Sequence, residues 1–110
     1  MIREKIFLTA ALMAVVVALR VHGAQYGDFK YTSDSTSVTI LEYTGKGGDV
    51  VVPSTIEGKP VRTIYDRAFL GCADVTGITI PDTVKYIGDS VFSNCISLTK
   101  ISMPDSVEII

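Results

Sequence analysis

The chain has 110 residues and a formal net charge of −2, which is enough for one small domain. It contains one histidine, His22, and two cysteines, Cys72 and Cys95. These are too few nitrogen and sulfur ligands for a tetrahedral zinc site, and a mildly acidic chain without a basic patch is poorly suited to nucleic-acid phosphates. We therefore expect no metal, no other cofactor and no nucleic-acid partner.

Residues 1–23 are predicted to be a secretory signal peptide. Arg3 and Lys5 precede an apolar run at residues 6–19, and small residues follow it. The run is short for a membrane span, and this order of basic, apolar and small segments is typical of a cleaved signal. We expect cleavage after Gly23, with Ala24 as the alternative position.

An uncleaved signal anchor is the competing interpretation, which Arg20 just after the apolar run favours. Cleavage would remove His22, the base that Ser-His-Asp and Cys-His catalysis require. The sequence thus predicts a secreted or cell-surface chain that is not an enzyme and has no membrane span after cleavage.

Residues 24–60 are predicted to form an N-terminal β cap and an irregular first coil. The β-rich runs 28–32 and 37–43 flank a short polar segment, which indicates a hairpin. Residues 50–52 are a third short strand, and residues 57–60 have the composition of a tight turn inserted before the regular pattern. A repeat protein needs such a cap because its first coil would otherwise expose an apolar face.

Residues 61–110 contain one unit written twice. Residues 64–72 return as 87–95, and residues 76–84 return as 99–107, always 23 positions later. A constant spacing of this size is typical of a leucine-rich-repeat solenoid. Nine positions are identical in the two copies: Ile64/Ile87, Asp66/Asp89, Phe69/Phe92, Cys72/Cys95, Thr76/Thr99, Ile78/Ile101, Pro81/Pro104, Asp82/Asp105 and Val84/Val107.

Each coil is predicted to contain a short strand, a short helix and a Pro-Asp turn. Alternation around Ile78 and Ile101 indicates a strand with one buried face, and stacked coils should pair these strands in parallel. Asp66 and Asp89 are expected to accept hydrogen bonds at helix starts. The phenylalanine that follows each aspartate should fill the space between helix and sheet.

The pattern Ile-x-x-x-x-Phe-x-x-Cys-x-x-x-Thr-x-Ile-x-x-Pro-Asp-x-Val, together with the preceding residues 47–61, resembles the BspA-like leucine-rich-repeat family. The resemblance covers residues 45–110. It implies an α/β solenoid on a cell surface, right-handed, with roles in adhesion to host matrix proteins or to other cells. The chain differs from the family's pattern in holding only about two full repeats, where members carry many.

Cys72 and Cys95 lie one repeat apart and should stack on neighbouring coils. Equivalent Cα atoms on adjacent strands lie about 5 Å apart, which a disulfide can span, and secretion leads to an oxidising compartment. The alternative is that each cysteine is a small buried hydrophobic residue. We favour free buried thiols over the disulfide.

The aspartate pairs Asp66/Asp89 and Asp82/Asp105 would also stack. Stacked carboxylates could be paired catalytic acids or calcium ligands, but a catalytic pair needs a cleft and one raised pKa. Helix starts and turns explain the same residues. We therefore assign these aspartates to local structure.

Candidate ligand contacts are residues that should face outward. Thr79, Lys100 and Ser102 occupy outward positions of the predicted sheet, and Tyr86 falls in an outward column with Thr63 and Ile109. Exposed aromatic residues are enriched at interfaces, although one exposed ring is ordinary. These four, Thr79, Tyr86, Lys100 and Ser102, form the predicted contact surface.

The first functional hypothesis is a non-enzymatic module that binds an extracellular protein, such as a host matrix protein or another cell-surface protein. The second is a structural remnant, a cap with repeats and no binding activity of its own. The last repeat is incomplete, which leaves apolar Val107 and Ile110 without a covering coil. Solenoids need such cover, so self-association through the uncapped C-terminal coil is expected.

Overall fold

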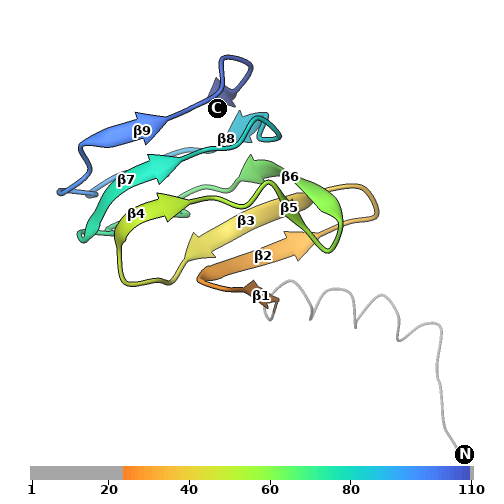
Figure 1. The fold of residues 1–110 in the computed structure, drawn as a ribbon, viewed down its shortest axis with the longest axis horizontal. Coiled ribbons are helices and arrows are strands. Elements are labelled where there is room, and N and C mark those ends of the chain that lie inside the picture. Colours follow the sequence, from red (N-terminus) through yellow and green to blue (C-terminus); the bar gives the residue numbers. More distant parts are fainter. Residues whose placement is uncertain (1–23, 110) are drawn as a thin grey trace, which may run out of the picture.

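The computed structural model describes residues 24–109, so the predicted signal peptide lies outside the described residues. This part of the chain contains ten β-strands and no helix (Figure 1). The strands are β1 (Gln25–Tyr26), β2 (Phe29–Ser33), β3 (Val38–Tyr43), β4 (Gly48–Val51), β5 (Thr55–Ile56), β6 (Lys59–Ile64), β7 (Val75–Thr79), β8 (Tyr86–Ile87), β9 (Lys100–Ser102) and β10 (Glu108–Ile109).

The strands form two sheets that enclose the core. The larger sheet has seven strands in the order β1-β2-β3-β6-β8-β10, with β5 paired to β6, and the smaller has the order β4-β7-β9. From β3 onward the larger path is parallel, as is the whole smaller sheet. The result is a β-solenoid of about three coils with repeats near 23 residues.

The first three strands are an antiparallel meander that closes the solenoid at its N-terminal end. Strands β2 and β3 form the hairpin expected from the sequence, with Thr32 opposite Thr39. Asp34 fixes their connection, because its Oδ1 accepts hydrogen bonds from the backbone N–H groups of Thr36 and Ser37, both at 2.8 Å. Strand β3 then pairs in parallel with β6, so the hairpin starts the stack of coils.

The inserted turn before the regular repeat is the two-residue loop of a β-hairpin formed by β5 and β6. Glu57 and Gly58 both have positive φ, 58° and 75°, which is the backbone of a type I′ turn. Two hydrogen bonds hold the Glu57 side chain. Its carboxylate accepts hydrogen bonds from the hydroxyls of Tyr31 and Ser33, so the turn is tied to strand β2 of the cap.

The prediction of short helices is wrong, and the reason is backbone handedness. Arg67 and Gly71 have φ of 61° and 71°, and their equivalents one repeat later, Ser90 and Asn94, have 57° and 62°. A right-handed helix cannot contain a left-handed residue at every fourth position. The segments after β6 and β8 are instead runs of turns.

These turns hydrogen-bond to the next coil, as strands in a sheet do. Alternate residues of one coil donate their backbone N–H groups, and alternate residues of the next coil accept through their carbonyl oxygens. The bonds are Arg67 to Asp89 at 3.0 Å, Phe69 to Val91 at 3.1 Å and Gly71 to Ser93 at 2.8 Å. We call this backbone segment of each coil, residues 66–71 or 89–94, the turn edge.

Asp66 and Asp89 therefore do not start helices, contrary to the prediction. Asp66 Oδ1 accepts a hydrogen bond from the backbone N–H of Asp89 at 2.9 Å, so it joins two coils. Asp82 and Asp105 lie in turns, as the sequence suggested. These turns are closed by hydrogen bonds from the Val84 N–H to the Pro81 carbonyl and from the Val107 N–H to the Pro104 carbonyl.

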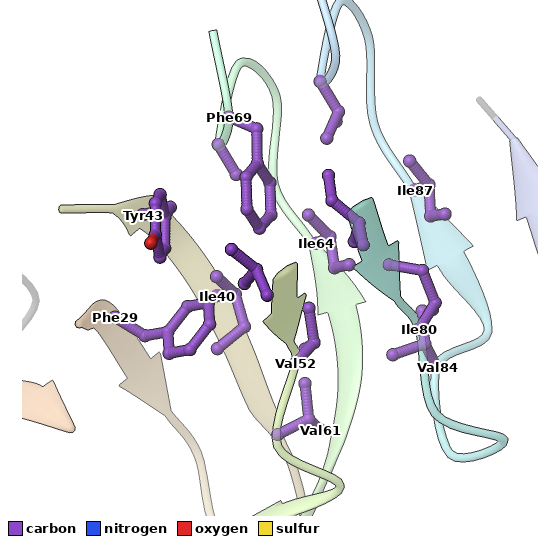
Figure 2. Close-up of a cluster of buried hydrophobic side chains, with 14 of the residues drawn as sticks. Phe29, Ile40, Tyr43, Val52, Val61, Ile64, Phe69, Ile80, Val84 and Ile87 are labelled. Carbon is purple, nitrogen blue, oxygen red and sulfur yellow. The ribbon is translucent and has the colours of Figure 1, made fainter. Parts of the chain in front are cut away.

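The core lies between the two sheets and the turn edges (Figure 2). Branched side chains from equivalent positions stack across the larger sheet, where Ile40 pairs with Ile64 and Ile64 with Ile87. Beside them runs an aromatic column. Its members are Phe29, Tyr43, Phe69 and Phe92, with Tyr43 stacked on Phe69 at 5.2 Å and Phe69 against Phe92 at 6.0 Å between ring centroids.

Candidate binding face

The outward face of the smaller sheet carries three of the four predicted contact residues. Val50 and Ile78 point into the core, with 6% and 2% of their surface exposed, so their neighbours along each strand point outward. These outward residues form two rows across the sheet. We call them the outer sheet face: Asp49, Gly77 and Lys100 in one row, and Val51, Thr79 and Ser102 in the other.

The first row places opposite charges on either side of a glycine. Asp49 pairs with Gly77, and Gly77 pairs with Lys100. A Cβ atom on Gly77 would collide with the Asp49 carboxylate oxygen and would lie 3.7 Å from Lys100 Cε. Both charged side chains therefore extend over the glycine, and a larger residue would push them apart.

The second row is apolar at one end and hydroxylated at the other. Val51 is 67% exposed, although valine is usually buried, and it lies beside Thr79, which lies beside Ser102. The outer sheet face thus offers an apolar contact, two hydroxyls and two opposite charges. This mixture is suited to a protein surface better than to a metal or a phosphate.

Asp49 and Val51 were missing from the sequence-based prediction. Both belong to the irregular first coil, which is separated from the next coil by 28 residues instead of 23. The signal that could have found them is Pro53, which precedes Pro81 by the same 28 positions. Applying that offset to Gly77 and Thr79 leads to Asp49 and Val51.

Tyr86 lies on the other sheet, so the structure does not bring it to Thr79, Lys100 and Ser102. It is in β8, 43% exposed, beside Thr63 of β6 as expected. Its other neighbour is Glu108, and Ile109 pairs with Ile87 instead. The predicted column of Thr63, Tyr86 and Ile109 is wrong at its last member, because β10 pairs one residue out of step with the 23-residue repeat.

The two cysteines are free and partly buried. Cys95 Sγ donates to the carbonyl oxygen of Phe69 at 3.0 Å, and the backbone N–H of Cys72 donates to the same oxygen at 3.1 Å. Burial raises the pKa of the Cys72 thiol, and the neighbouring Cys95 and Glu42 add to the effect. Cys72 also lines an open hollow of about 350 Å³ between residues 43–47 and 71–75.

Residues 24–109 contain no group of three histidine, cysteine, aspartate or glutamate side chains that could hold a metal ion. Within the same residues, no helix is long and apolar enough to cross a membrane.

Comparison with known proteins identifies the repeat. Residues 52–110 match the family model described as BspA type leucine rich repeat region. A leucine rich repeat protein of T. pallidum is 34% identical with a TM-score of 0.73, over 78% of this chain and 42% of that one. A leucine rich cell surface protein of Faecalibacterium prausnitzii is 32% identical with a TM-score of 0.66, over 76% of this chain and 24% of that one.

A leucine-rich repeat protein of Bacteroides capillosus is 26% identical, with a TM-score of 0.69 over 78% of this chain and 69% of that one. The chain spans less than half the length of the T. pallidum and F. prausnitzii proteins. No curated protein matches it. The family match covers more than half of the chain, so the chain belongs to the BspA type leucine rich repeat family.

Proposed function

We propose that the chain is a non-enzymatic binding module displayed outside the cell and that its outer sheet face contacts an extracellular protein. The observation that carries the proposal is the row of Asp49, Gly77 and Lys100 beside the exposed Val51. Display outside the cell is supported by the predicted signal peptide and by the similarity to a protein named as a leucine rich cell surface protein.

The outer sheet face has the makeup of a protein interface. The fold does not use these side chains, because the core is filled from the opposite face of the same strands. An exposed valine offers apolar area to a partner, and charges of both signs at fixed positions select the partner's orientation. The partner should therefore present a basic group toward Asp49 and an acidic group toward Lys100, with an apolar residue over Val51.

A binding screen of the whole chain against extracellular matrix proteins and cell-surface proteins tests the proposal. Lys100→Glu should weaken binding by roughly fivefold to a hundredfold, because it sets a like charge against the partner's acidic group. Lys85→Glu is the control, since Lys85 directly precedes β8 of the other sheet and its side chain makes one long hydrogen bond, to the Ser106 hydroxyl at 3.4 Å. Absence of any binding at about micromolar concentration would favour the structural remnant instead.

A further inference from the structure

Strand β4 is the first strand of the smaller sheet. In the described part of the chain the order is β4-β7-β9, so β4 has a neighbouring strand on one side only (Figure 1). Gly48 donates its backbone N–H to the Asp74 carbonyl just before β7, and Val52 donates to the carbonyl of the last β7 residue. Backbone groups of a strand point to alternate sides, so those of Asp49 and Val51 point away from β7. We call this side of β4 the open edge.

The N-terminal cap closes the other sheet at this end of the solenoid. Strands β3 and β4 belong to the same coil, and β2 pairs with β3 as an antiparallel strand from Phe29 to Ser33. No strand within residues 24–109 pairs with β4 in the equivalent way. The open edge is therefore a property of the cap, which provides a strand for the larger sheet and none for the smaller.

The open edge is accessible and has a defined chemistry. Asp49 is exposed and Val51 is 67% exposed, whereas Val50 between them is buried. The strand is short, because Gly47 and Gly48 have positive φ before it and Pro53 follows it closely. An added strand would thus meet the backbone groups of two residues, one carboxylate and one apolar side chain.

We propose that the open edge binds an extended segment of the partner polypeptide as an antiparallel strand, in the way that β2 adds to β3. The segment has an apolar residue opposite Val51 and, two positions later, a lysine or arginine opposite Asp49. This inference rests on the function proposed for the outer sheet face, because Asp49 and Val51 belong to both. It specifies that the extracellular partner is held through its backbone as well as its side chains.

The charge of Asp49 disfavours a second copy of the chain as the added strand. No antiparallel register of two β4 strands puts a cation opposite Asp49, because Gly48–Val51 contains no basic residue. Such a pair would also bring two carboxylates to one edge, which destabilises strand pairing. A basic segment supplies the missing charge, and an antiparallel strand is common at the edge of a parallel sheet.

The capped peptide Ser-Thr-Val-Thr-Lys-Thr-Ser is the probe. Antiparallel addition sets its valine opposite Val51 and its lysine opposite Asp49. We expect it to bind the whole chain with a dissociation constant of about 100 μM, since a short peptide must be ordered on binding. Replacing the peptide lysine by glutamate should weaken binding about threefold to tenfold, because like charges then lie across the strands.

Methylation of single peptide amides tests the strand geometry. In antiparallel addition the amides of the peptide valine and lysine face β4, and the amide of the threonine between them faces away. N-methylation of the valine or the lysine should weaken binding at least about tenfold, and N-methylation of that threonine should leave it nearly unchanged. Equal weakening at the three positions, or the opposite pattern, would overturn the proposal.

Amide hydrogen exchange tests whether the edge is open in the chain. Without peptide, the amides of Asp49 and Val51 should exchange quickly, and the Val50 amide, which faces β7, should be protected. Peptide at about 1 mM should slow exchange at Asp49 and Val51 about tenfold. Protection of these two amides without peptide would contradict the proposal, because another segment or a second copy would already cover the edge.

Two substitutions of Val51 separate its backbone from its side chain. Val51→Pro removes a donor from the open edge and keeps the bonds between β4 and β7, so it should weaken peptide binding at least about tenfold. Val51→Thr keeps the donor and should weaken binding only about twofold to threefold. Thermal melts check that both variants fold. If Val51→Pro does not fold, the methylated peptides decide, because they leave the chain unchanged.

The inference and the proposed function fail in different ways. A protein from the binding screen that loses affinity with Lys100→Glu but not with Val51→Pro would bind the outer sheet face without an added strand, which would overturn the inference alone. Peptide binding at the open edge without any extracellular protein bound in the screen would support the strand site and contradict the proposed function. No peptide binding at about millimolar concentration would overturn the inference.

Discussion

Asp66 accepts a hydrogen bond from the backbone N–H of Asp89, the residue that occupies its own position one coil later, at 2.9 Å. The two aspartates occupy equivalent positions of successive repeats, but they use different groups: Asp66 accepts with its side-chain carboxylate, and Asp89 donates with its backbone amide. Gly88 lies directly against it, since a Cβ there would collide with Asp66 Oδ1 and lie 2.8 Å from the Asp66 backbone nitrogen.

Asp66→Ala should lower the free energy of unfolding by about 1 kcal/mol, because it removes one hydrogen bond between coils. Urea denaturation measures the change. Asp82→Ala is the control, since Asp82 is exposed in a turn that backbone atoms close. An equal decrease in the free energy of unfolding for Asp66→Ala and Asp82→Ala would show that the hydrogen bond from Asp89 to Asp66 does not stabilise the fold.

Gly88→Ala should destabilise the chain by about 1–3 kcal/mol, because the added methyl group overlaps the neighbouring coil. The double variant with Asp66→Ala should not recover the loss, since the backbone nitrogen of Asp66 remains in the way. Thermal melts of the single and double variants test this. Full recovery would mean that only the side chain of Asp66 excludes the methyl group.

Substitution of Gly71 measures the energetic cost of a left-handed backbone without any steric clash. A Cβ at Gly71 meets no atom within 4 Å, but the residue has φ of 71°. Gly71→Ala should therefore cost about 1 kcal/mol through the left-handed backbone alone. Gly71→Asn should cost less, because asparagine tolerates this conformation and already occupies the equivalent position as Asn94.

The contact between Tyr31 and Glu57 should make stability depend on pH at the acidic end. The hydrogen bond from the Tyr31 hydroxyl lowers the pKa of Glu57 below its ordinary value of 4.5 in the folded chain. A group whose folded-state pKa is depressed contributes stability that is present above its unfolded pKa and lost as the pH falls through the folded value. Acid titrations of the melting temperature should show this loss.

Glu57→Gln should remove that part of the acid dependence, because the amide does not titrate. The comparison variant is Glu42→Gln, which changes an exposed glutamate of β3 outside this contact. Identical acid profiles for wild type and Glu57→Gln would contradict the assigned cause.

Thiol labelling tests the state of the cysteines. Two thiols per chain should react after denaturation, because Cys72 and Cys95 are free. In the native chain Cys72 should react several-fold more slowly than after unfolding, because its raised pKa lowers the thiolate fraction. A mass spectrum of labelled Cys95→Ser isolates the signal of Cys72. No labelling after denaturation would indicate an intermolecular or intercoil disulfide.

Repeat spacing and alternation predicted much of the fold correctly. Pairing of β7 with β9 and of Thr63 with Tyr86 follows directly from the offset of 23, because equal positions on stacked coils become neighbours. The hairpin cap followed from two β-rich runs around a polar turn. These features depend only on the local alternation of apolar and polar residues and on the repeat spacing of 23 residues.

The turn edge could not be predicted in the same way. Its sequence, an aspartate followed by small and apolar residues, equally suits the first turn of a helix. What decides against a helix is the left-handed backbone at Arg67 and Ser90, two residues that do not usually adopt it. Turn bonds within each coil and hydrogen bonds between the two coils accompany that conformation, and a local sequence pattern does not reveal the bonds between coils.

The candidate face was predicted in part. Thr79, Lys100 and Ser102 followed from alternation, because every second residue of a strand faces outward. Asp49 and Val51 come from a coil whose length differs from the repeat, so the regular offset passes over them. Tyr86 was grouped with Thr79, Lys100 and Ser102 because the sequence pattern does not reveal that each coil contributes to two separate sheets.

The one-way hydrogen bonding of the turn edges means that coils fit together by translation and not by inversion. An in-frame tandem duplication of 23 codons would therefore create a matching interface at once, since each new coil carries both the donors and the acceptors that its neighbours need. A duplication of a different length would put the left-handed positions out of step. The fold can thus lengthen by copying itself while the outward residues change freely.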